Sequence, residues 1–479
     1  VRSQREIAQD VAKLDTLVSG TTIQDRIPKR SHHKLHTSTY YMNNRKKFIR
    51  QLVPLFKKYS EDLQNGKQPS RGDIFEPMIH QQVIRDYLNL YTPYRGLLLF
   101  HGLGSGKTCS SIVTAEGMKS QKQIYVLTLA SLKANFFNQL KECGDPMYRL
   151  DQYWEFISVE GRPDYIPVLS NTLSLPLDSI QKRGGAWMVN ANKESNFQDL
   201  SDADKKALNE QIDEMIRSKY IDVNYNGLNE NIMERMTENG TINPFDNSVV
   251  IIDEVHNFVS MIVNKIREKK SISYRLYEYL MSATNTRIVL LSGTPIINYP
   301  NEIGILYNIL RGYIKTWTFP VKIMAGAEKP TRDNIVKWLE EEGLHVFDYV
   351  EFSGESVMIT RNPFGFVNKN VAPKKNKEGT RKLRDERHNK TQKIGGGFEE
   401  YRGIQLDESG NLSDVDFKKL VVKALRKHGL ETPIPSKIKS TNNIALPDNS
   451  KEFLQLFVEL DSSEMKNKHV FQKRILGLT

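Results

Sequence analysis

The sequence predicts an α/β fold built around a parallel sheet, and three observations support this prediction. Short apolar runs at 95–100, 124–129 and 287–295 alternate with segments of helical periodicity. A glycine-rich turn joins the first of these runs to a helical segment. A pair of carboxylates follows another apolar run, which begins at residue 248. Buried parallel strands are continuous apolar runs, and the helices between them cover both faces of the sheet.

The alternation of strands and helices extends from residue 78 to residue 313, with one long interruption. The interrupting region, 145–247, is more polar and less regular, so we expect an insertion there. Within it, 202–220 predicts a polar helix, and 153–159 and 221–228 are strand-like. The helices predicted outside the insertion are 78–88, 106–120, 130–143, 273–283 and 301–313.

The length of 479 residues predicts several domains, because one hydrophobic core does not extend over so long a chain. The α/β part covers 71–315, and 1–70 is a basic N-terminal segment with a predicted helix. Residues 316–370 predict an α+β accessory segment. Residues 371–397 are rich in lysine and arginine and nearly without apolar side chains, so we expect a disordered basic linker. The last part, 398–479, has an α+β character.

The glycine-rich turn predicts a phosphate-binding loop. It lies in the stretch LLLFHGLGSGKTCSSI (97–112), between a buried strand and a helix. Backbone N–H groups at such a helix start bind phosphate oxygens, the lysine neutralises the β- and γ-phosphates, and the threonine hydroxyl binds Mg²⁺. The usual pattern begins with glycine where this chain has His101. The residues expected to hold the nucleotide are Gly104, Ser105, Gly106, Lys107 and Thr108.

The carboxylate pair lies in VVIIDEVH (249–256), at the end of a buried strand. Ligands of open α/β sheets bind at this end of the strands. Asp253 can hold Mg²⁺ directly or through water, and Glu254 can orient and deprotonate an attacking water molecule. Two carboxylates after a strand are common in isolation, but the phosphate-binding loop in the same chain favours a catalytic pair.

A third buried strand ends in LLSGTPIIN (290–298), where small hydroxyl residues flank a glycine. The side chains of Ser292 and Thr294, on either side of Gly293, can hydrogen-bond the carboxylate pair and sense the γ-phosphate. A plain transition from strand to turn is the alternative interpretation. The order of the three motifs favours the functional one.

The net charge of +11 is unevenly distributed along the chain. Residues 1–60 contain 13 Lys/Arg and 4 Asp/Glu, and 371–397 contain 9 and 3, so these two blocks carry +9 and +6. Basic blocks of this kind are typical of proteins that bind phosphate backbones. A solvated tail would explain one such block equally well, but two blocks beside a nucleotide site favour a nucleic acid partner.

Other classes of partner and compartment are less favoured. No apolar run reaches the length of a membrane span, and no signal peptide is recognisable, so we expect no membrane partner. The two cysteines, Cys109 and Cys143, are too few for a disulfide framework and indicate a reducing compartment. No Cys/His cluster has the spacing of a metal site.

The three motifs, in this order, resemble the first motor lobe of superfamily 2 helicases and translocases. The family's first motif often starts with a residue other than glycine, as HGLGSGKT does, and DEVH resembles its motif II. SGTPIIN, completed by Asn298, resembles motif III of the Swi2/Snf2-like branch. Segments 80–112, 127–145 and 290–303 together resemble the poxvirus-type helicases of large DNA viruses, which are relatives of nucleoside triphosphate phosphohydrolase I and of the early transcription factor small subunit.

This resemblance implies a RecA-like P-loop NTPase lobe that binds ATP and Mg²⁺ and hydrolyses the nucleotide. It implies that His256 acts with Lys107, Asp253 and Glu254 and couples the γ-phosphate to nucleic acid. Residues 292–294 would link hydrolysis to movement.

Further roles follow only from the resemblance. Gln81 would read adenine, with Gln82 as the competing candidate. The residues implied to lie beside the nucleic acid are Ala130, Ser131, Leu132, Asn224 and Tyr225.

A two-lobed motor needs a second RecA-like lobe with an arginine finger, usually in a Q-x-x-G-R-x-x-R motif. This sequence contains no such motif. The stretch VFQKRILGLT (470–479) resembles the entry into that lobe, so 398–479 predicts the start of an incomplete second lobe, or else an accessory domain.

The expected function is that of an ATP-dependent helicase or translocase acting on nucleic acid, DNA more readily than RNA. We expect it to work on duplex DNA in viral transcription, at initiation or termination, with viral RNA polymerase or transcription factors as partners. The expected location is the virion and the host cytoplasm. Two alternatives stay open: a nucleotide-binding platform for transcription or virion assembly that is not a motor, and an RNA or repair helicase of the same superfamily.

Overall fold

The computed structural model describes most of 77–361 and most of 413–479, together with isolated residues between 26 and 64. Most of the predicted basic N-terminal segment and all of the predicted linker 371–397 lie outside the described residues. None of the described helices has the length and apolar character needed to cross a lipid bilayer. The described ranges are 77–89, 95–102, 104–326, 330–344, 347–361, 413–432, 437–459, 464–475 and 477–479.

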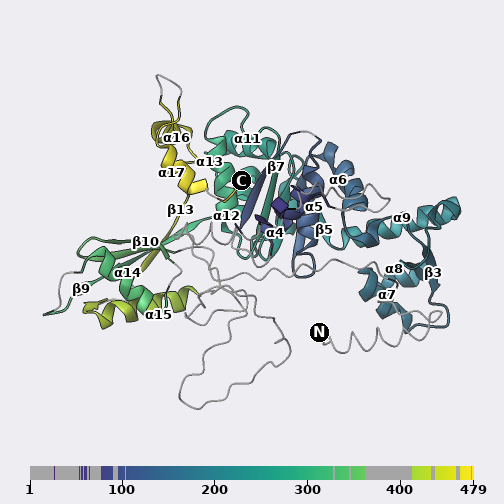
Figure 1. Ribbon diagram of the computed structural model, residues 1–479, viewed down its shortest axis with the longest axis horizontal. Helices are drawn as coiled ribbons and strands as arrows, with labels where there is room; N and C mark the ends of the chain where they lie inside the picture. The colour runs from purple at the N-terminus through teal and green to yellow at the C-terminus, as the bar shows by residue number, and fades with distance from the viewer. Residues whose placement is uncertain are drawn as a thin grey trace, which may run out of the picture.

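A five-stranded parallel sheet lies at the centre of the molecule, in the strand order β1-β7-β6-β2-β5 (Figure 1). The α/β fold class predicted from the sequence is therefore confirmed. The strand of the phosphate-binding loop, β1, is paired with β7, and the strand of the carboxylate pair, β6, is in the middle. The strands are β1 Gly96–Phe100, β2 Gln123–Thr128, β5 Tyr220–Asn224, β6 Ser248–Ile252 and β7 Arg287–Ser292.

Helices cover both faces of this sheet, and β6 shows why its sequence is continuously apolar. Val249 and Ile251 point into one core, and Val250 and Ile252 point into the other, so every residue of the strand is buried. Alternate side chains of a strand point to opposite faces. The first core is covered by α4 Ile79–Tyr87, α5 Lys107–Glu116, α6 Ala130–Cys143 and α9 Asp202–Arg217. The second is covered by α11 Val255–Lys265, α12 Ile272–Ser282 and α13 Glu302–Arg311.

The predicted insertion is an ordered unit that packs on the first core. It leaves the sheet after α6 and returns at β5, so it lies at the edge where the strands begin. At this edge the Lys119 ammonium pairs with Asp145, and the Tyr220 hydroxyl donates to Glu116 Oε1 at 2.6 Å. The insertion therefore lies opposite the phosphate-binding loop. Its elements are η1 Pro146–Tyr148, β3 Trp154–Ser158, α7 Tyr165–Leu173, α8 Leu177–Arg183, β4 Gly185–Val189, η2 Phe197–Asp199 and α9, and α10 Glu230–Met236 follows β5.

A second unit follows α13 and has a core of its own. Its antiparallel sheet has the order β10-β11-β8-β13, and Trp317 and Phe319 of this sheet pack against Phe417 and Val421 of a helix. The unit lies on the other side of the central sheet from the insertion (Figure 1). Its elements are β8 Ile314–Pro320, β9 Lys322–Ile323, α14 Arg332–Glu341, β10 Phe347–Phe352, β11 Ser356–Arg361, α15 Asp414–Lys427, β12 Leu430–Glu431 and β13 Lys439–Asn443.

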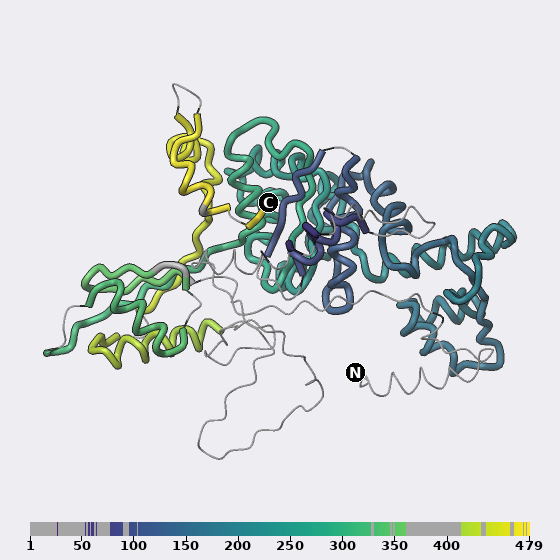
Figure 2. Tube along the Cα trace, viewed as in Figure 1, coloured from purple at the N-terminus to yellow at the C-terminus, as the bar shows by residue number. Residues whose placement is uncertain are grey.

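The C-terminal segment returns to the central sheet. It does not form a separate unit that starts at residue 398, as the sequence predicted. Helices α16 Ser450–Phe457 and α17 Lys468–Ile475 lie beside α13 (Figures 1 and 2), and Phe453, Phe457 and Phe471 belong to the second core. The Leu98 N–H of β1 donates to the Leu478 carbonyl at 2.7 Å. The described part of 398–479 is thus divided between the core of the second unit and the second core of the central sheet. In both cores its apolar residues pack against elements that lie much earlier in the sequence.

Candidate nucleotide-binding site

The phosphate-binding loop connects β1 to α5 and depends on two glycines. Gly104 and Gly106 have φ angles of +76° and +74°, in the left-handed region that favours glycine. A Cβ atom at Gly106 would also lie 2.8 Å from Gln81 Nε2, too close for a side chain. Gly106 caps the start of α5, so the free N–H groups of this helix face the loop.

Lys107, the first residue of α5, reaches back into the loop. Its Nζ donates to the carbonyl oxygens of His101 at 2.8 Å and Gly102 at 3.3 Å. A Cβ atom on Gly293 would lie 3.6 Å from the same Nζ, so the turn after β7 comes close to the lysine. The ammonium group therefore lies where the first and third motifs meet.

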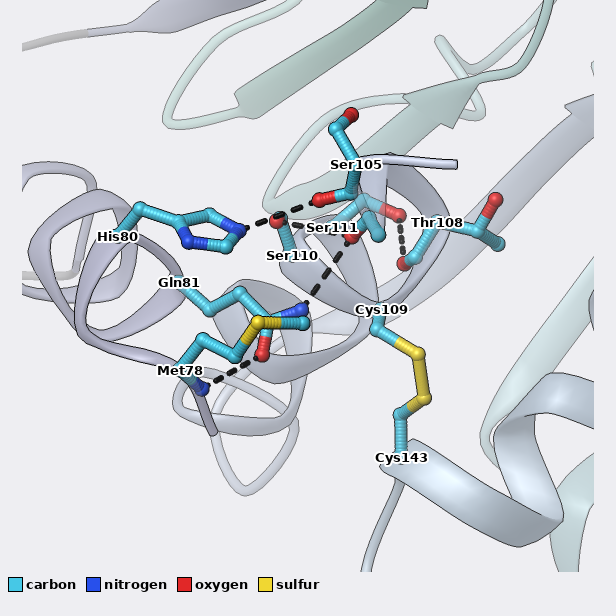
Figure 3. The surroundings of a disulfide bond; sticks show 10 residues. Met78, His80, Gln81, Ser105, Thr108, Cys109, Ser110, Ser111 and Cys143 are labelled. Atoms are coloured by element: carbon cyan, nitrogen blue, oxygen red, sulfur yellow. Dashed lines mark hydrogen bonds between the residues drawn. A yellow bond between two sulfur atoms is a disulfide. The ribbon is translucent and has the colours of Figure 1, made fainter. Parts of the chain in front are cut away.

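Helix α4 supports the loop from one side (Figure 3). Gln81 is fully buried; its Oε1 accepts the Met78 N–H at 2.9 Å, and its Nε2 donates to the Gly106 carbonyl at 3.4 Å. His80 Nε2 lies 3.2 Å from the Ser105 carbonyl oxygen. Gln82, the competing candidate, donates to the Pro77 carbonyl at 2.8 Å. The oxygen and the nitrogen of the Gln81 amide thus both form hydrogen bonds with backbone groups. Its adenine-reading role stays a prediction.

The predicted catalytic turn, Asp253 and Glu254, follows β6 directly. The Asp253 N–H donates to the Leu127 carbonyl at 3.0 Å, and Asp253 Oδ1 accepts the Glu254 N–H at 3.0 Å. Burial, and next the negative charge of Glu254, raise the Asp253 pKa to about 6, although Lys107 acts in the opposite direction. A second positive charge beside this carboxyl group would favour its ionised form.

Binding of Mg²⁺ beside Asp253 stays a prediction. Mg²⁺ usually keeps several water ligands and binds to one or two protein groups together with substrate phosphates. Asp253 and the Thr108 hydroxyl would hold it, and the ion would neutralise charge on the β- and γ-phosphates. Among the described residues, no group of three or more His, Cys, Asp or Glu side chains is arranged to hold a metal by itself.

A short polar chain joins the second motif to the third. His256 Nδ1 lies 3.3 Å from Glu254 Oε2 and 3.0 Å from Ser292 Oγ. Ser292 is fully buried, and its Oγ accepts the Thr294 N–H at 3.0 Å. The structure therefore links His256 to Ser292 and Thr294 through hydrogen bonds. The coupling roles that the resemblance implied for these residues stay predictions.

Glu302 is a residue of this region that the motifs did not reveal. It is 1% exposed, and its Oε2 accepts the N–H groups of Ile297 at 2.8 Å and Asn298 at 3.1 Å. Asn298 Nδ2 in turn donates to Ser260 Oγ on α11 at 3.0 Å. These contacts fix the turn that follows the third motif. An acidic residue a few positions after the motif was the available signal.

Four of the five residues predicted to face nucleic acid are at least partly exposed near the same sheet edge. Ala130, Ser131 and Leu132 begin α6 directly after β2, and Asn224 ends β5. Strands β2 and β5 are neighbours, with Thr128 opposite Asn224. The fold therefore places these four side by side, and their contact with nucleic acid stays a prediction.

The prediction for Tyr225 is wrong as a direct contact. This side chain is 2% exposed, and its hydroxyl lies 3.4 Å from the carbonyl oxygens of both Asp253 and Glu254. Its ring meets the Phe258 ring edge-on, with centroids 5.5 Å apart. The strand ends here, and the aromatic ring turns into the second core instead of toward solvent.

The two cysteines form a disulfide next to the nucleotide site (Figure 3). Cys109 follows Thr108 in α5, Cys143 ends α6, and their Cα atoms are 5.4 Å apart. The sequence pattern predicted no disulfide framework and did not reveal this single bond, because 34 residues separate the two cysteines. The disulfide joins the helix of the phosphate-binding loop to the helix after β2.

Comparison with known proteins agrees with this geometry, although no family model matches the chain. A protein of Acanthamoeba polyphaga mimivirus named as an ATP-dependent RNA helicase is 30% identical over 240 residues, which are 49% of this chain and 33% of that protein. A protein of Invertebrate iridescent virus 3 named as a helicase is 26% identical over 253 residues, 50% of this chain and 20% of that protein. A relative of the chain in Frog virus 3 is likewise named as a helicase.

A poxvirus relative extends the comparison. The early transcription factor 70 kDa subunit of Melanoplus sanguinipes entomopoxvirus is 24% identical over 242 residues, which are 50% of this chain and 26% of that protein. The resemblance to viral helicases predicted from the three motifs is thereby confirmed. The chain spans a third or less of the length of each of these relatives.

Proposed function

We propose that the chain contains the nucleotide-binding lobe of an ATP-dependent helicase or translocase. One observation carries this proposal: Lys107, the carboxylate pair at Asp253 and Glu254, and the turn at Gly293 converge at one edge of the sheet. Positioned charges of this kind bind the phosphates and Mg²⁺ and orient the attacking water. The helicase names of the viral relatives support it.

The direct test is the Lys107→Ala variant. The ammonium group of Lys107 would stabilise the negative charge that develops on the phosphates during hydrolysis. Without it, ATP hydrolysis should fall to background. Lys182→Ala is the matched control, because Lys182 is exposed on α8 in the insertion, away from the loop. Measuring phosphate release for both variants decides the matter, and hydrolysis by Lys107→Ala at the parent rate would disprove the site.

We further propose duplex DNA as the substrate, in viral transcription, with viral RNA polymerase or transcription factors as partners. The early transcription factor relative supports this role, whereas the mimivirus relative is named for RNA. The experiment compares stimulation of ATP hydrolysis by duplex DNA, single-stranded DNA and RNA at one salt concentration, because phosphate contacts are strongly salt-dependent. Stimulation by RNA alone would reject the DNA proposal.

A second candidate function is a nucleotide-regulated platform for transcription or virion assembly that is not a motor. The poxvirus relative supports it, because that protein is named as a transcription factor subunit and not as a helicase. Such a platform would bind ATP through Lys107 but show no hydrolysis stimulated by any nucleic acid. For both candidates we propose the virion and the host cytoplasm as the location, which fractionation of infected cells would test.

A further inference from the structure

Tyr225 connects the end of β5 with the turn after β6, although these two strands are not paired with each other in the sheet. It directly follows Asn224, the last residue of β5, and β2 separates β5 from β6 in the sheet. Its hydroxyl nevertheless reaches the turn after β6 and lies 3.4 Å from two carbonyl oxygens there, those of Asp253 and Glu254. The Tyr225 side chain therefore links the end of β5 to the catalytic turn.

The turn that Tyr225 contacts has a backbone conformation that needs support. Glu254 has φ +46°, in the left-handed region, although it is not glycine. Such a conformation is costly for a residue with a Cβ and persists only where surrounding contacts stabilise it. The Glu254 carbonyl accepts the Asn257 N–H at 3.0 Å and also faces the Tyr225 hydroxyl. This conformation sets the direction of the Glu254 carboxylate.

The other end of the bridge is a compact turn at the exposed edge. Asn224 is partly exposed, and its Oδ1 accepts the Asn226 N–H at 3.2 Å. A Cβ atom at Gly227 would lie 2.6 Å from Asn224 Nδ2, so the amide is packed against this glycine. A ligand that moves Asn224 would also move the neighbouring residue, Tyr225.

We propose that Tyr225 is a positioning residue that couples the end of β5 to the conformation of the catalytic turn. It would touch neither nucleotide nor nucleic acid. Nucleic acid bound at Asn224 shifts the strand end, the Tyr225 hydroxyl follows, and the Glu254 carboxylate is placed to orient the attacking water molecule. This inference rests on the proposed function, because it assumes that nucleic acid stimulates hydrolysis.

The test is Tyr225→Phe, which removes the hydroxyl and keeps the ring against Phe258. The measured quantity is the ratio of kcat with saturating duplex DNA to kcat without it. We expect this ratio to fall about 3- to 10-fold, the range for loss of one hydrogen bond. A purely structural role would lower both rates in proportion and leave the ratio unchanged. Tyr125→Phe is the matched control, since Tyr125 lies on β2 with its ring against Phe245.

The possible outcomes separate the inference from the proposed function. If the unaltered protein is stimulated and Tyr225→Phe shows the same ratio, the inference fails and the proposed function stands. If no nucleic acid stimulates the unaltered protein, both fail. Should Tyr225→Phe not fold, Asn224→Ala tests the same link from the exposed side. A reduced ratio with unchanged KM for ATP supports the inference, and an unchanged ratio contradicts it.

Discussion

The surroundings of the Asp253 carboxyl group favour its protonated form more than water does. It is mostly buried and lies next to a second carboxylate, Glu254, so its pKa is raised to about 6. Lys107 only partly offsets these effects. The motif predicted the residue and its role as a ligand, but not this energetic state. Burial and neighbouring charge depend on how β6 and α11 pack, which the sequence pattern does not reveal.

The raised pKa predicts how the stability of the metal-free protein depends on pH. In the unfolded chain Asp253 loses its proton near pH 4, whereas in the folded protein it keeps the proton up to about pH 6. Its contribution to folding is therefore complete below pH 4 and is lost as the pH rises through 6. Relative to Asp253→Asn, the protein should lose up to about 3 kcal/mol of unfolding free energy between pH 4 and pH 8.

Urea unfolding without Mg²⁺, at several pH values, measures this difference. Glu160→Gln is the control, because Glu160 is an exposed carboxylate in the insertion. The unfolding free energy of Glu160→Gln should change with pH in parallel with that of the unaltered protein. Parallel curves for Asp253→Asn would show instead that the Asp253 pKa is ordinary.

The helices and strands around the motifs could be predicted from the sequence, because their periodicity is local. The predicted helix 130–143 coincides with α6, and the predicted strand at 124–129 differs from β2 by one residue at each end. Contacts between distant elements could not be predicted in this way. Asn308, a polar residue in α13, is fully buried because it pairs with the backbone of Leu446. Nothing near either residue in the sequence indicates this pairing.

The Asn308 side chain should therefore be important for stability. Its Nδ2 donates to the Leu446 carbonyl at 2.8 Å, and its Oδ1 accepts the Leu446 N–H at 2.9 Å. Asn308→Ala would leave two buried backbone groups without partners, at a cost of roughly 2–5 kcal/mol. Thermal unfolding measures the loss. Asn209→Ala, on the partly exposed surface of α9, is the control and should change the melting temperature little.

The disulfide between α5 and α6 gives a second prediction at this scale. Closing a loop of 34 residues restricts the unfolded chain and should stabilise the oxidised protein by about 3–4 kcal/mol. The urea midpoint of the unaltered protein should fall when a reductant is added, whereas the midpoint of Cys143→Ser should not respond. An unaltered midpoint on reduction, with two free thiols counted, would show that the bond contributes nothing.

At the scale of the whole molecule, negative and positive charge are concentrated in different parts of the chain. This distribution bears on where a nucleic acid would bind. The ordered insertion, 145–219, contains 9 Lys/Arg and 13 Asp/Glu, so it carries −4 and lies at the edge where the strands begin. The first 60 residues carry +9. A polyanion is repelled by the first region and attracted by the second. The sequence predicted the basic block but not the location of the acidic one, which follows from the topology.

Salt dependence provides the last prediction. Each phosphate that a protein cation neutralises contributes about 0.9 to the slope of log affinity against log salt for duplex DNA. Changing Arg45, Lys46 and Lys47 to glutamine removes three positive charges from the basic N-terminal segment. We expect the slope to become shallower by about 1 to 3, with weaker binding at low salt and little change near 0.5 M. Fluorescence anisotropy over a salt series measures both quantities.

The matched control removes the same charge from the acidic insertion. Lys182, Lys206 and Arg217 belong to α8 and α9, far along the chain from the basic segment. Their change to glutamine alters the net charge of the protein by the same amount, so a general electrostatic effect would weaken binding equally in both variants. Local phosphate contacts would change the slope only in the first variant. Equal slopes in the two variants would therefore show that the basic N-terminal segment does not contact the nucleic acid.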